Sequence, residues 1–443
     1  MTDTTLTVPA VPTTPDHRLF RGWFETGAPA GLAEHLDRYG PAPLPTDRRD
    51  RQALIEAVEQ AGLTGRGGAA FPTGVKLRSV AERRGPAVLV VNGMESEPAS
   101  RKDEALLDLA PHLVLDGAAL AAAAVGATAV HLCLPRDEAR AAQAAWLAEA
   151  VAERRRAGLD PLPVELHLLP HHYVSSEESS LVQWLNGGPA RPLATPPRPF
   201  EKGVARRPTL VDNVETLAHL ALIARYGPAW FRTAGRPDAP GTALVTVSGA
   251  VREPGVREVP LGMPLGTLLA GVGGTTRPLG ALLVGGFFGS WLPAEQALRV
   301  PFAKPALAEL GAGPGAGVLV ALPAQACGLA ETARVLRFLA AQSAQQCGPC
   351  RFGLPAVAAD FELLAWGTPD GELARRLPHR VGLLAGRGAC RHPDGASRLA
   401  ATALSTFAAD VEHHLLAGPC PGTALPPVLV VPDRPAADQE GWR

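Results

Sequence analysis

The chain has 443 residues, of which 46% are hydrophobic and 19% are charged, and its formal net charge is −1. This length predicts about two to four domains, and the composition is typical of globular domains and excludes a wholly disordered chain. The balanced charge gives no indication of a nucleic-acid partner or of binding to an anionic membrane surface.

A secretory signal or a membrane-spanning segment in the sequence would indicate the cellular location of the protein. The opening sequence, MTDTTLTVPAVPTTPDHRLF, lacks the basic start and apolar run of a secretory signal. No stretch reaches about 18 uninterrupted apolar residues; the one from Leu113 to Val130 comes nearest, but Asp116 interrupts it. We therefore expect a cytoplasmic protein without a membrane span. Its six cysteines should be reduced unless they bind metal.

A glycine-rich loop follows a short helix near the N-terminus. Residues 1–16 are rich in Thr and Pro and are expected to be disordered, and a helix over 53–62 ends at a glycine. The next segment, GLTGRGGAAFPTGVK, runs to Lys76 and matches neither the Rossmann nor the Walker spacing. Its glycines let backbone N–H groups approach an anion closely, with Arg66 and Lys76 beside them. The loop therefore predicts a cradle for a nucleotide or flavin phosphate, and an ordinary flexible surface loop is the alternative.

Strands and helices alternate after the loop. We expect strands over 87–91, 127–134 and 164–169, and helices over 111–126 and 136–157. This alternation indicates an α/β domain with a parallel sheet. We assign it residues 60–238, after an N-terminal extension of residues 1–59.

Two acidic clusters follow strands of this sheet, at the edge where α/β proteins bind ligands. Glu95 and Glu97 come after the first strand, and Glu177 and Glu178 after the third. Carboxylates accept hydrogen bonds from ribose hydroxyls and from the amide of a dihydronicotinamide. The alternative is that Ser176 or Glu177 simply caps the helix expected over the next residues.

The segment 189–208 is rich in Pro and Arg and is expected to be an extended loop. A helix should begin after it, with Asp212 or Asn213 as the N-cap, and end at Gly227. The free N–H groups at its start suit a phosphate, although a plain capped helix explains the pattern equally well.

The character of the chain changes twice in its second half. Residues 241–293 alternate β-type residues with Gly and Pro-Gly turns, and a closing strand is expected over 317–322, so 239–322 should form a β-rich domain. Phe287 and Trp291 are expected in its core. From residue 324 the pattern is helical, with breaks near Gly367 and Gly386 and a last helix over 396–417. We assign 323–420 to a helical domain and 421–443 to a tail.

The helical domain carries a group of cysteines. Cys347 and Cys350 form a C-x2-C pair, and Cys390 follows forty positions later. This spacing is typical of metal ligands, while a C-x2-C pair can also be a redox couple. Cys420 joins the site if the last helix packs back. Cys133 and Cys327, the remaining two, are expected to pack in the core.

Four motifs resemble one family, in the same order: GRGGAAFPTGVK, NGMESEP, YVSSEES and PTLVDNVET. They resemble the NADH-oxidising flavoprotein subunit of respiratory complex I and related subunits of NAD-linked hydrogenases and formate dehydrogenases. The flavin-bearing subunit of the ion-pumping ferredoxin–NAD reductase is also similar. The resemblance covers roughly residues 60–420. It implies an α/β fold with a Rossmann-like flavin-binding domain, a β-grasp (SLBB) domain and a C-terminal helical bundle.

The resemblance also implies an FMN cradle and an NAD(H) site. Glu95, Glu97, Glu177 and Glu178 would face the flavin and the nicotinamide, with Glu95, Glu97 and Glu178 as the catalytic residues. Phe71 and Phe200 would supply aromatic surface for the adenine. By motif position, the cradle would be lined by Gly65, Arg66, Gly67, Gly68, Lys76, Asn92, Tyr173, Thr209, Asp212 and Asn213.

The family's cluster motif, C-x2-C-x2-C with a distant fourth Cys, is incomplete here. Its last three positions are Cys347, Cys350 and Cys390, but the first falls on Ala344. The resemblance therefore implies a [4Fe–4S] cluster with an altered fourth ligand, for which we include Cys420. The nearby residues Gln345, Gln346 and His392, an exogenous ligand, zinc, or no metal at all are the alternatives.

Three further departures concern the nucleotide site. Met94 stands where the family has an acid, Ser176 where it has a glycine, and Leu77 and Ser79 at the aromatic positions after the loop lysine. FMN binding is therefore more firmly implied than NADH oxidation.

The expected function is that of an oxidoreductase that passes electrons from NADH through FMN and an iron–sulfur cluster to a redox partner. That partner would be a ferredoxin or a two-iron ferredoxin-like subunit, with the protein peripheral to any membrane complex. One alternative is a flavin-retaining docking subunit without NADH turnover, and another is a β-grasp scaffold that binds a small ligand. The pair Glu177–Glu178 favours the enzyme, whereas Met94, Ser79 and Ala344 favour the alternatives.

Overall fold

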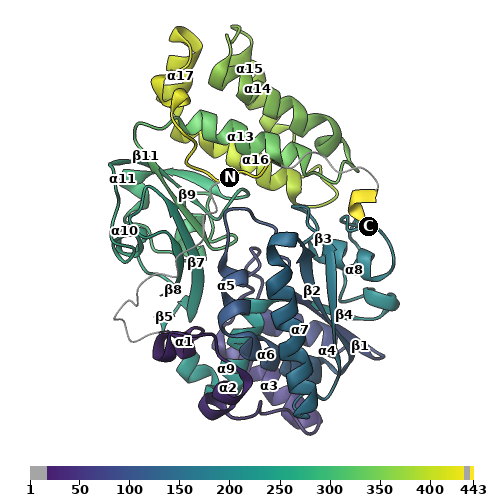
Figure 1. Ribbon diagram of the computed structural model, residues 1–443. Helices are drawn as coiled ribbons and strands as arrows, with labels where there is room; N and C mark the ends of the chain where they lie inside the picture. Colours follow the sequence, from purple (N-terminus) through teal and green to yellow (C-terminus); the bar gives the residue numbers. More distant parts are fainter. Residues whose placement is uncertain (1–16, 434–439) are drawn as a thin grey trace.

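The protein is described by a computed structural model that covers residues 17–433 and 440–443. The expected disorder of residues 1–16 lies outside the described residues. Figure 1 shows an α/β part at the lower right, a β-rich part beside it and a group of helices at the top. From residue 17 on, four helices precede the first strand: α1 (Arg21–Thr26), α2 (Leu32–Tyr39), α3 (Arg48–Ala61) and α4 (Thr73–Ala81).

The α/β part is built on a four-stranded parallel sheet with the order β3-β2-β1-β4. The first three strands confirm the sequence-based prediction. The fourth lies where a loop leading into a helix was expected. It is short and ends in Asp212 and Asn213, residue types that strands disfavour, and it forms because it pairs along β1. The strands are β1 (Ala87–Asn92), β2 (Ala127–Arg136), β3 (Val164–Pro170) and β4 (Thr209–Asn213).

Helices cover both faces of this sheet. The predicted helix over 136–157 begins later, because β2 continues to Arg136 and Asp137 then caps a short 3-10 turn. The helix expected to end at Gly227 is kinked there (φ 82°) and continues through Pro228. The helices are α5 (Lys102–Leu109), α6 (Pro111–Val125), η1 (Glu138–Arg140), α7 (Ala141–Arg156), α8 (Glu178–Leu185), η2 (Val204–Arg206) and α9 (Val214–Phe231).

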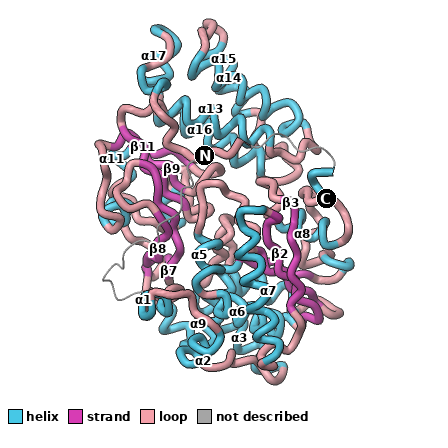
Figure 2. The backbone as a smooth tube through the Cα atoms, in the orientation of Figure 1, coloured by secondary structure: helices cyan, strands magenta, loops and turns pink. Residues whose placement is uncertain are grey.

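The β-rich part has a five-stranded mixed sheet of order β10-β9-β11-β7-β8, in which β11 runs parallel to β7. This matches the expected β-grasp domain. In Figure 2 its strands form a group separate from the strands of the α/β sheet, with helices between the two groups. The elements are β5 (Gly235–Arg236), β6 (Ala239–Pro240), β7 (Thr242–Gly249), β8 (Gly255–Pro260), α10 (Leu265–Ala270), β9 (Leu279–Val284), β10 (Ser290–Pro293), α11 (Ala294–Ala297), α12 (Lys304–Ala308) and β11 (Val318–Pro323).

The C-terminal part is helical, as predicted, with breaks after Trp366 and at Gly386. The expected last helix is two helices separated at Phe407. Phe287 and Trp291 are buried in the core that this part shares with the β-grasp sheet, which confirms their predicted role. The elements are α13 (Gly328–Ala341), a π-helical turn η3 (Pro349–Gly353), α14 (Leu354–Trp366), α15 (Leu373–Gly382), α16 (His392–Thr406), α17 (Ala408–Ala417), η4 (Pro421–Ala424) and η5 (Glu440–Trp442).

In the described part of the chain, no single helix has the length and hydropathy needed to cross a membrane. The bent pair of α5 and α6 passes that test only when the two helices are taken together. Helix α6 is buried along nearly its whole length and crosses α9 closely. A Cβ at Gly117 would lie 1.9 Å from the carbonyl oxygen of Leu217, so only glycine permits this crossing.

Asp116 is the one charge in this apolar helix, and it lies in a buried ion-pair network. Its carboxylate contacts Arg154 Nη2 (2.8 Å), His35 Nε2 (2.7 Å) and Arg225 Nη2. Burial raises the pKa of Asp116, but the hydrogen bond from His35 and the charge of Arg154 outweigh it and lower the pKa to about 2. The network joins α2, α6, α7 and α9 behind the sheet.

Asp116→Asn should lower the free energy of unfolding at pH 7 by about 3–5 kcal/mol, because the buried Arg225 loses its counter-ion and Arg154 keeps only Asp160. The folded pKa is below the unfolded value of 3.8, so this contribution exists above about pH 4 and is lost as the pH falls toward 2. Urea unfolding at both ends of this range measures it. The surface pair Glu149–Arg156 provides the control, since Glu149→Gln should change stability by less than about 1 kcal/mol. Equal effects of the two substitutions would contradict the prediction.

Candidate functional site

Polar residues meet at the carboxyl ends of β1 and β4. Asn92 and Asn213 are the last residues of the two strands and pair in register. Asn213 Oδ1 accepts the N–H of Glu215 at 3.0 Å, so Asn213 is the N-cap of α9, as predicted. Asn92 Nδ2 donates to the carbonyl of Ser176 at 2.9 Å. The strand ends, the start of α9 and the loop before α8 therefore converge on one edge of the sheet.

Lys76 on α4 reaches the same edge. Its Nζ donates to the carbonyl of Val211 at 2.5 Å and lies 3.6 Å from Glu178 Oε2. Next to it, the carboxylate of Asp212 is buried, which raises its pKa to about 6, although the charge of Lys76 lowers it. Asp212 Oδ2 has no hydrogen-bond partner among the described residues. A buried acceptor left unpaired beside a lysine suits a ligand that carries N–H or O–H donors.

The glycine loop lies against this edge. A Cβ at Gly67 would have Asn213 Cβ as its nearest neighbour, at 3.5 Å, and one at Gly65 would meet nothing closer than 3.6 Å. These are ordinary contact distances, so the packing of the protein itself does not require glycine at either position. Close approach of a ligand to the backbone is a physical reason for glycine there.

Arg66, predicted to neutralise the ligand, is instead bound within the protein. Its Nη1 donates to Thr64, its Nη2 donates to the carbonyl of Thr242 at 3.0 Å, and its Nε lies 3.7 Å from Glu215 Oε1. The side chain is buried, which lowers its pKa. It therefore fixes the loop to β7, and the loop's backbone is left to face a ligand.

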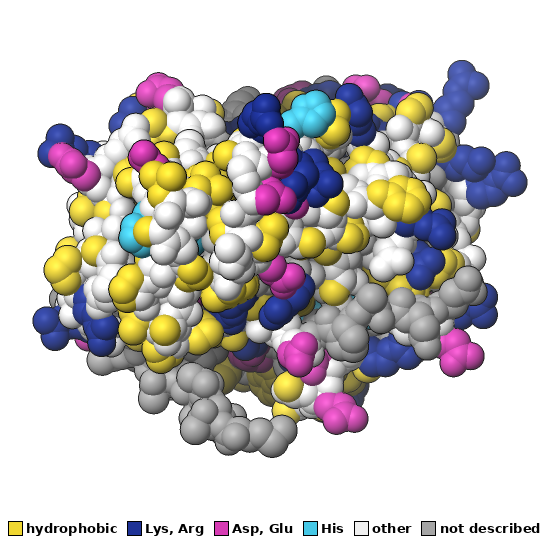
Figure 3. Space-filling model, turned by 90° about the horizontal axis from the view of Figure 1, so that it is seen from above, with side chains coloured by type: hydrophobic (Ala, Val, Ile, Leu, Met, Phe, Trp, Pro, Cys, Tyr) yellow, Lys and Arg dark blue, Asp and Glu magenta, His cyan; other side chains and the backbone are white. Residues whose placement is uncertain are grey.

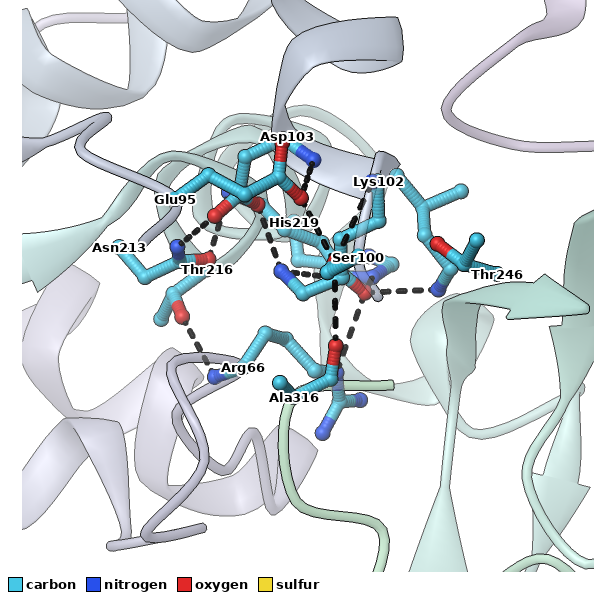
Figure 4. Close-up of polar contacts among 12 residues, drawn as sticks. Arg66, Glu95, Ser100, Lys102, Asp103, Asn213, Thr216, His219, Thr246 and Ala316 are labelled. Atoms are coloured by element: carbon cyan, nitrogen blue, oxygen red, sulfur yellow. Dashed lines mark hydrogen bonds and ion pairs between the residues drawn. The ribbon is translucent and has the colours of Figure 1, made fainter. Parts of the chain in front are cut away.

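Figure 4 shows the buried polar network around this arginine. Lys102 Nζ lies 2.9 Å from Glu215 Oε2 and 2.6 Å from Asp103 Oδ1. Asn213 Nδ2 donates to Asp103 Oδ2 at 2.7 Å. Burial raises the pKa of Glu215, but Lys102 and other neighbours bring it down to about 2. Sequence reasoning missed Lys102, Asp103 and Glu215. The signal for Lys102 and Asp103 was their place at the end of the stretch NGMESEPASRKDE, and that for Glu215 was its place in PTLVDNVET.

A cavity of about 160 Å³ lies between the loop and the β-grasp part. It shares Gly65, Arg66 and Gly68 with the predicted cradle and continues to Leu244 and Phe302. Lys76, Asn92, Asp212 and Glu178 are not part of its lining. The glycine loop therefore has this cavity on one side and the strand ends on the other. The polar groups expected to bind a cofactor lie on the side of the strand ends.

Two of the predicted catalytic carboxylates are buried and hydrogen-bonded internally. Glu95 (φ 29°) accepts the N–H groups of Asp103 (2.9 Å) and Glu104 (2.8 Å), so it caps the start of α5. Glu97 accepts Tyr173 Oη–H at 2.7 Å and the N–H of Phe287 at 2.8 Å. Burial raises the pKa of Glu97 to about 7, although the hydrogen bonds from Tyr173 and Phe287 lower it. It links the α/β part to the β-grasp part.

The second acidic pair divides its roles. Glu177 Oε2 accepts the N–H groups of Ser179 and Ser180, so it is the N-cap of α8, the alternative that sequence reasoning had left open. Glu178 has a side chain that is 30% exposed and faces Lys76. It is the one predicted catalytic residue whose carboxylate remains accessible to a ligand.

Four predicted cofactor-binding residues lie apart from this edge. Thr209 begins β4, about 13 Å from Asn213 at the usual rise per strand residue, and its hydroxyl accepts the N–H of Val204. Phe200 packs on the core beside Arg83. Phe71 follows the glycine loop and is 52% exposed. Tyr173 is buried below the site, where its ring contacts Phe288.

Three of the predicted cysteine ligands lie together, between α13 and α16. Burial raises the pKa of the Cys350 thiol, and the neighbouring thiols of Cys347 and Cys390 raise it further. Burial likewise raises the pKa of Cys390 to about 11, and Glu177 contributes to that shift. Ala344, three residues before Cys347, packs against Val174, which places this region beside the loop that carries the acidic pair.

Two residues near these cysteines in the chain, Ser343 and His392, have buried polar atoms. The hydrogen bond between the Ser343 hydroxyl and Cys350 lowers the pKa of that thiol. Ser343 Oγ has no nitrogen or oxygen partner among the described residues. His392 Nε2 contacts the carbonyl of Leu339 at 2.8 Å, which leaves the buried Nδ1 as an unpaired acceptor. Ala344, at the position of the missing cysteine, packs against Val174 and Trp442.

Cys420 is not brought to this group. Its neighbours are Cys327 and His414 near the start of α13 and the end of α17. Cys327 is buried as predicted, but beside these two polar residues rather than in a purely apolar setting.

Three family models match the chain. They are the Nuo51 FMN-binding domain over residues 58–222, the SLBB domain over 244–284, and the NADH-ubiquinone oxidoreductase-F iron-sulfur binding region over 330–414. These matches fall on the α/β, β-grasp and helical parts respectively.

Similar proteins span most of the chain. The NADH-quinone oxidoreductase F protein of Streptomyces coelicolor is 32% identical over 83% of this chain and 84% of its own length. The second such F protein of Rhizobium meliloti is 29% identical over 92% and 97%. A solved structure of NAD+-reducing [NiFe]-hydrogenase in the H2-reduced state superposes with a TM-score of 0.80. It is 32% identical and covers 91% of this chain and 68% of the hydrogenase chain.

Gly67→Val should abolish flavin retention without unfolding the protein. Its Cβ has room against Asn213, but the branched side chain takes the space in which a ligand meets the backbone. We expect bound FMN after purification to fall about tenfold or more, which corresponds to about 1.4 kcal/mol of binding free energy. Gly371→Val is the matched control, since nothing lies within 4 Å of its Cβ position. Absorbance of the released flavin measures both, and unchanged FMN in a folded Gly67→Val protein would rule the site out.

Proposed function

This chain belongs to the F family of NADH-quinone oxidoreductase proteins, and we propose that it takes electrons from NADH at the strand-end site and delivers them through the cysteine group to a partner protein. The matched domains support FMN, NAD(H) and a [4Fe–4S] cluster as its cofactors. The observation that carries the proposal is the carboxylate oxygen Oδ2 of Asp212, which is buried without a hydrogen-bond partner among the described residues, at the edge where the glycine loop, β1 and β4 meet.

The residues at this edge fit a flavin. FMN, when bound, supplies hydride acceptance and the release of electrons one at a time. The backbone of the glycine loop would lie against the FMN. Asp212 Oδ2 would accept a hydrogen bond from an N–H or O–H group of the FMN. Lys76 would hold negative charge near the ring. Asn92 and Asn213 fix the strand ends, and Asn213 also orients α9.

Glu178 would position the nucleotide. Its carboxylate is accessible and salt-bridged to Lys76, whereas Glu95, Glu97 and Glu177 are engaged by backbone N–H groups. A carboxylate in this position accepts hydrogen bonds from a ribose or a carboxamide. Glu95 and Glu97 would act indirectly, by fixing α5 and the contact with the β-grasp part.

The cysteine group fits a cluster with three thiolate ligands. Cys347, Cys350 and Cys390 would supply these, and the fourth ligand would come from His392 or Ser343, which have buried polar atoms without a nitrogen or oxygen partner among the described residues. Cys420 lies with other partners. Ala344 packs against Val174 in the loop that leads to Glu178, so the cluster region and the flavin edge would be neighbours in the fold.

The partner would dock on the helical end of the molecule. Phe352, two residues after Cys350, is 70% exposed, and Trp366, Leu383 and Leu416 are also exposed in this part. Figure 3 views this end and shows hydrophobic side chains between basic and acidic ones. Exposed apolar residues near an electron-exit point suit a transient redox partner, for which we propose a ferredoxin-like iron–sulfur protein.

Glu178→Gln should slow the reduction of bound FMN by NADH about tenfold, because a hydrogen bond to a neutral amide oxygen is weaker than one to a carboxylate, while the FMN content stays unchanged. Stopped-flow bleaching of flavin absorbance under anaerobic conditions measures this. Glu201→Gln, a substitution at an exposed carboxylate paired with Arg83, is the matched control and should react as the wild type does. Equal rates for Glu178→Gln and wild type would remove Glu178 from the site. If NADH bleached none of the three proteins, the flavin-retaining docking subunit would be the better description.

The cluster proposal predicts unequal effects of two cysteine substitutions. After anaerobic reconstitution, Cys350→Ser should lose most of its iron, because thiolate ligation holds iron–sulfur clusters in proteins. Cys420→Ser should keep the wild-type iron content, since Cys420 lies in a different group. Iron analysis with the optical spectrum tests this. Iron loss in Cys420→Ser equal to that in Cys350→Ser would contradict the assignment. If one of the variants His392→Ala and Ser343→Ala holds less iron than the wild type, that residue is the fourth ligand.

A further inference from the structure

Cys420 belongs to a second group of metal-ligating side chains, separate from the cysteines of the cluster motif. One ligand atom from each of Cys327, His414 and Cys420 lies within 4.8 Å of the other two. Cys327 is the N-cap of α13, His414 lies on α17, and Cys420 opens the η4 turn. Three separate elements of the fold therefore present two thiols and an imidazole to one point.

The imidazole is oriented for ligation. His414 Nδ1 lies 2.9 Å from the carbonyl of Leu364, and because a carbonyl only accepts, Nδ1 must carry the proton. Nε2 then carries a lone pair, which accepts the N–H of Cys420 at 3.1 Å, and Cys327 Sγ lies 3.7 Å from the same atom. A ligating histidine that donates its other N–H to a backbone carbonyl is the arrangement that fixes ring orientation in metal sites.

The separation of these atoms matches a tetrahedral ion. With Zn–S at about 2.3 Å and Zn–N at about 2.0–2.1 Å, tetrahedral geometry places sulfur and nitrogen about 3.5–3.6 Å apart. The observed 3.7 Å requires little movement. The N–H of Cys420 donates to His414 Nε2 at 3.1 Å, and this hydrogen bond would have to break when the lone pair of Nε2 binds the ion. Gly418 has nothing within 4 Å of its Cβ position, so the segment has space to adjust.

We propose that Cys327, His414 and Cys420 bind one zinc ion, with a water molecule as the fourth ligand. Two thiolates and an imidazole form a ligand set that binds zinc in preference to magnesium, calcium or manganese. Cys327 and His414 are buried, while Cys420 is half-exposed and provides the path of entry. The ion joins α13 and α17 to the segment that follows them. This site does not depend on the flavin or on the iron–sulfur cluster.

A second His/Glu group on the α/β sheet must be distinguished from this site. His131 Nδ1, Glu165 Oε2 and His167 Nε2 lie 3.0–3.7 Å from one another on β2 and β3. Glu165 is 60% exposed, and the group has no thiolate. Zinc held there would be weakly bound, so His131→Ala separates the two locations.

The first experiment uses the full-length wild-type protein. After incubation with zinc chloride and dialysis, we expect one zinc per chain. X-ray absorption at the zinc edge should show two sulfur neighbours at about 2.3 Å and one imidazole at about 2.0 Å. A shell of oxygen and nitrogen alone, the absence of tightly held zinc, or a disulfide between Cys327 and Cys420 in protein kept under reducing conditions would overturn the proposal.

Variants locate the ion. Cys327→Ser and Cys420→Ser should each retain less than a tenth of the wild-type zinc after dialysis. His414→Gln should do the same, whereas His413→Gln, which changes the exposed neighbouring residue, should bind zinc as the wild type does. Cys350→Ser should lose iron but keep zinc, and His131→Ala should keep zinc. Loss of zinc in His131→Ala or in Cys350→Ser, with retention in Cys420→Ser, would overturn the proposal. If a variant fails to fold, the absorption spectrum of the wild type still decides.

Discussion

The arrangement of this protein depends on one buried group of charges. The side chains of Lys102 and Arg66 meet those of Asp103 and Glu215, all four are buried, and each carboxylate has a cationic neighbour. Glu215 also accepts the N–H of Leu244, so the group ties the glycine loop, α5 and α9 to the first strand of the β-grasp sheet. Buried ions are tolerated only when paired and hydrogen-bonded, so these elements must keep one relative placement. The loop is thereby held rigid against the strand ends.

This constraint explains how one acidic motif serves both structure and ligand binding. Glu95 caps α5 and Glu97 holds Tyr173 and the N–H of Phe287, so both act by fixing the walls of the site. Glu177 caps α8, and this capping positions Glu178 opposite Lys76. The accessible functional groups are few, and they are held in place by the buried ones. Such preorganisation is what a protein contributes when a cofactor supplies the chemistry.

Much of this could be predicted from the sequence. The apolar runs at 87–91, 127–134 and 164–169 are strands because they are long enough and bounded by turns, and the glycine loop and N-cap are local signals. Strand β4 could not be predicted, since five residues ending in Asp-Asn form a strand only by pairing with β1. The internal use of Arg66 and the separation of Cys420 from Cys350 depend on long-range packing that no local pattern encodes. The motif resemblance placed Thr209 in the cradle, whereas the strand register places it at the far end of β4.

The cofactor is proposed to lie at the carboxyl ends of β1 and β4, on the side of the glycine loop that faces Lys76 and Asp212. The most direct test is a crystal structure of the chain reconstituted with FMN. We expect flavin density in contact with the backbone of Gly65 and Gly67, with Asp212 Oδ2 accepting a hydrogen bond from it. Flavin density in the cavity lined by Lys102 and Leu244 instead, or away from the glycine loop altogether, would contradict this placement.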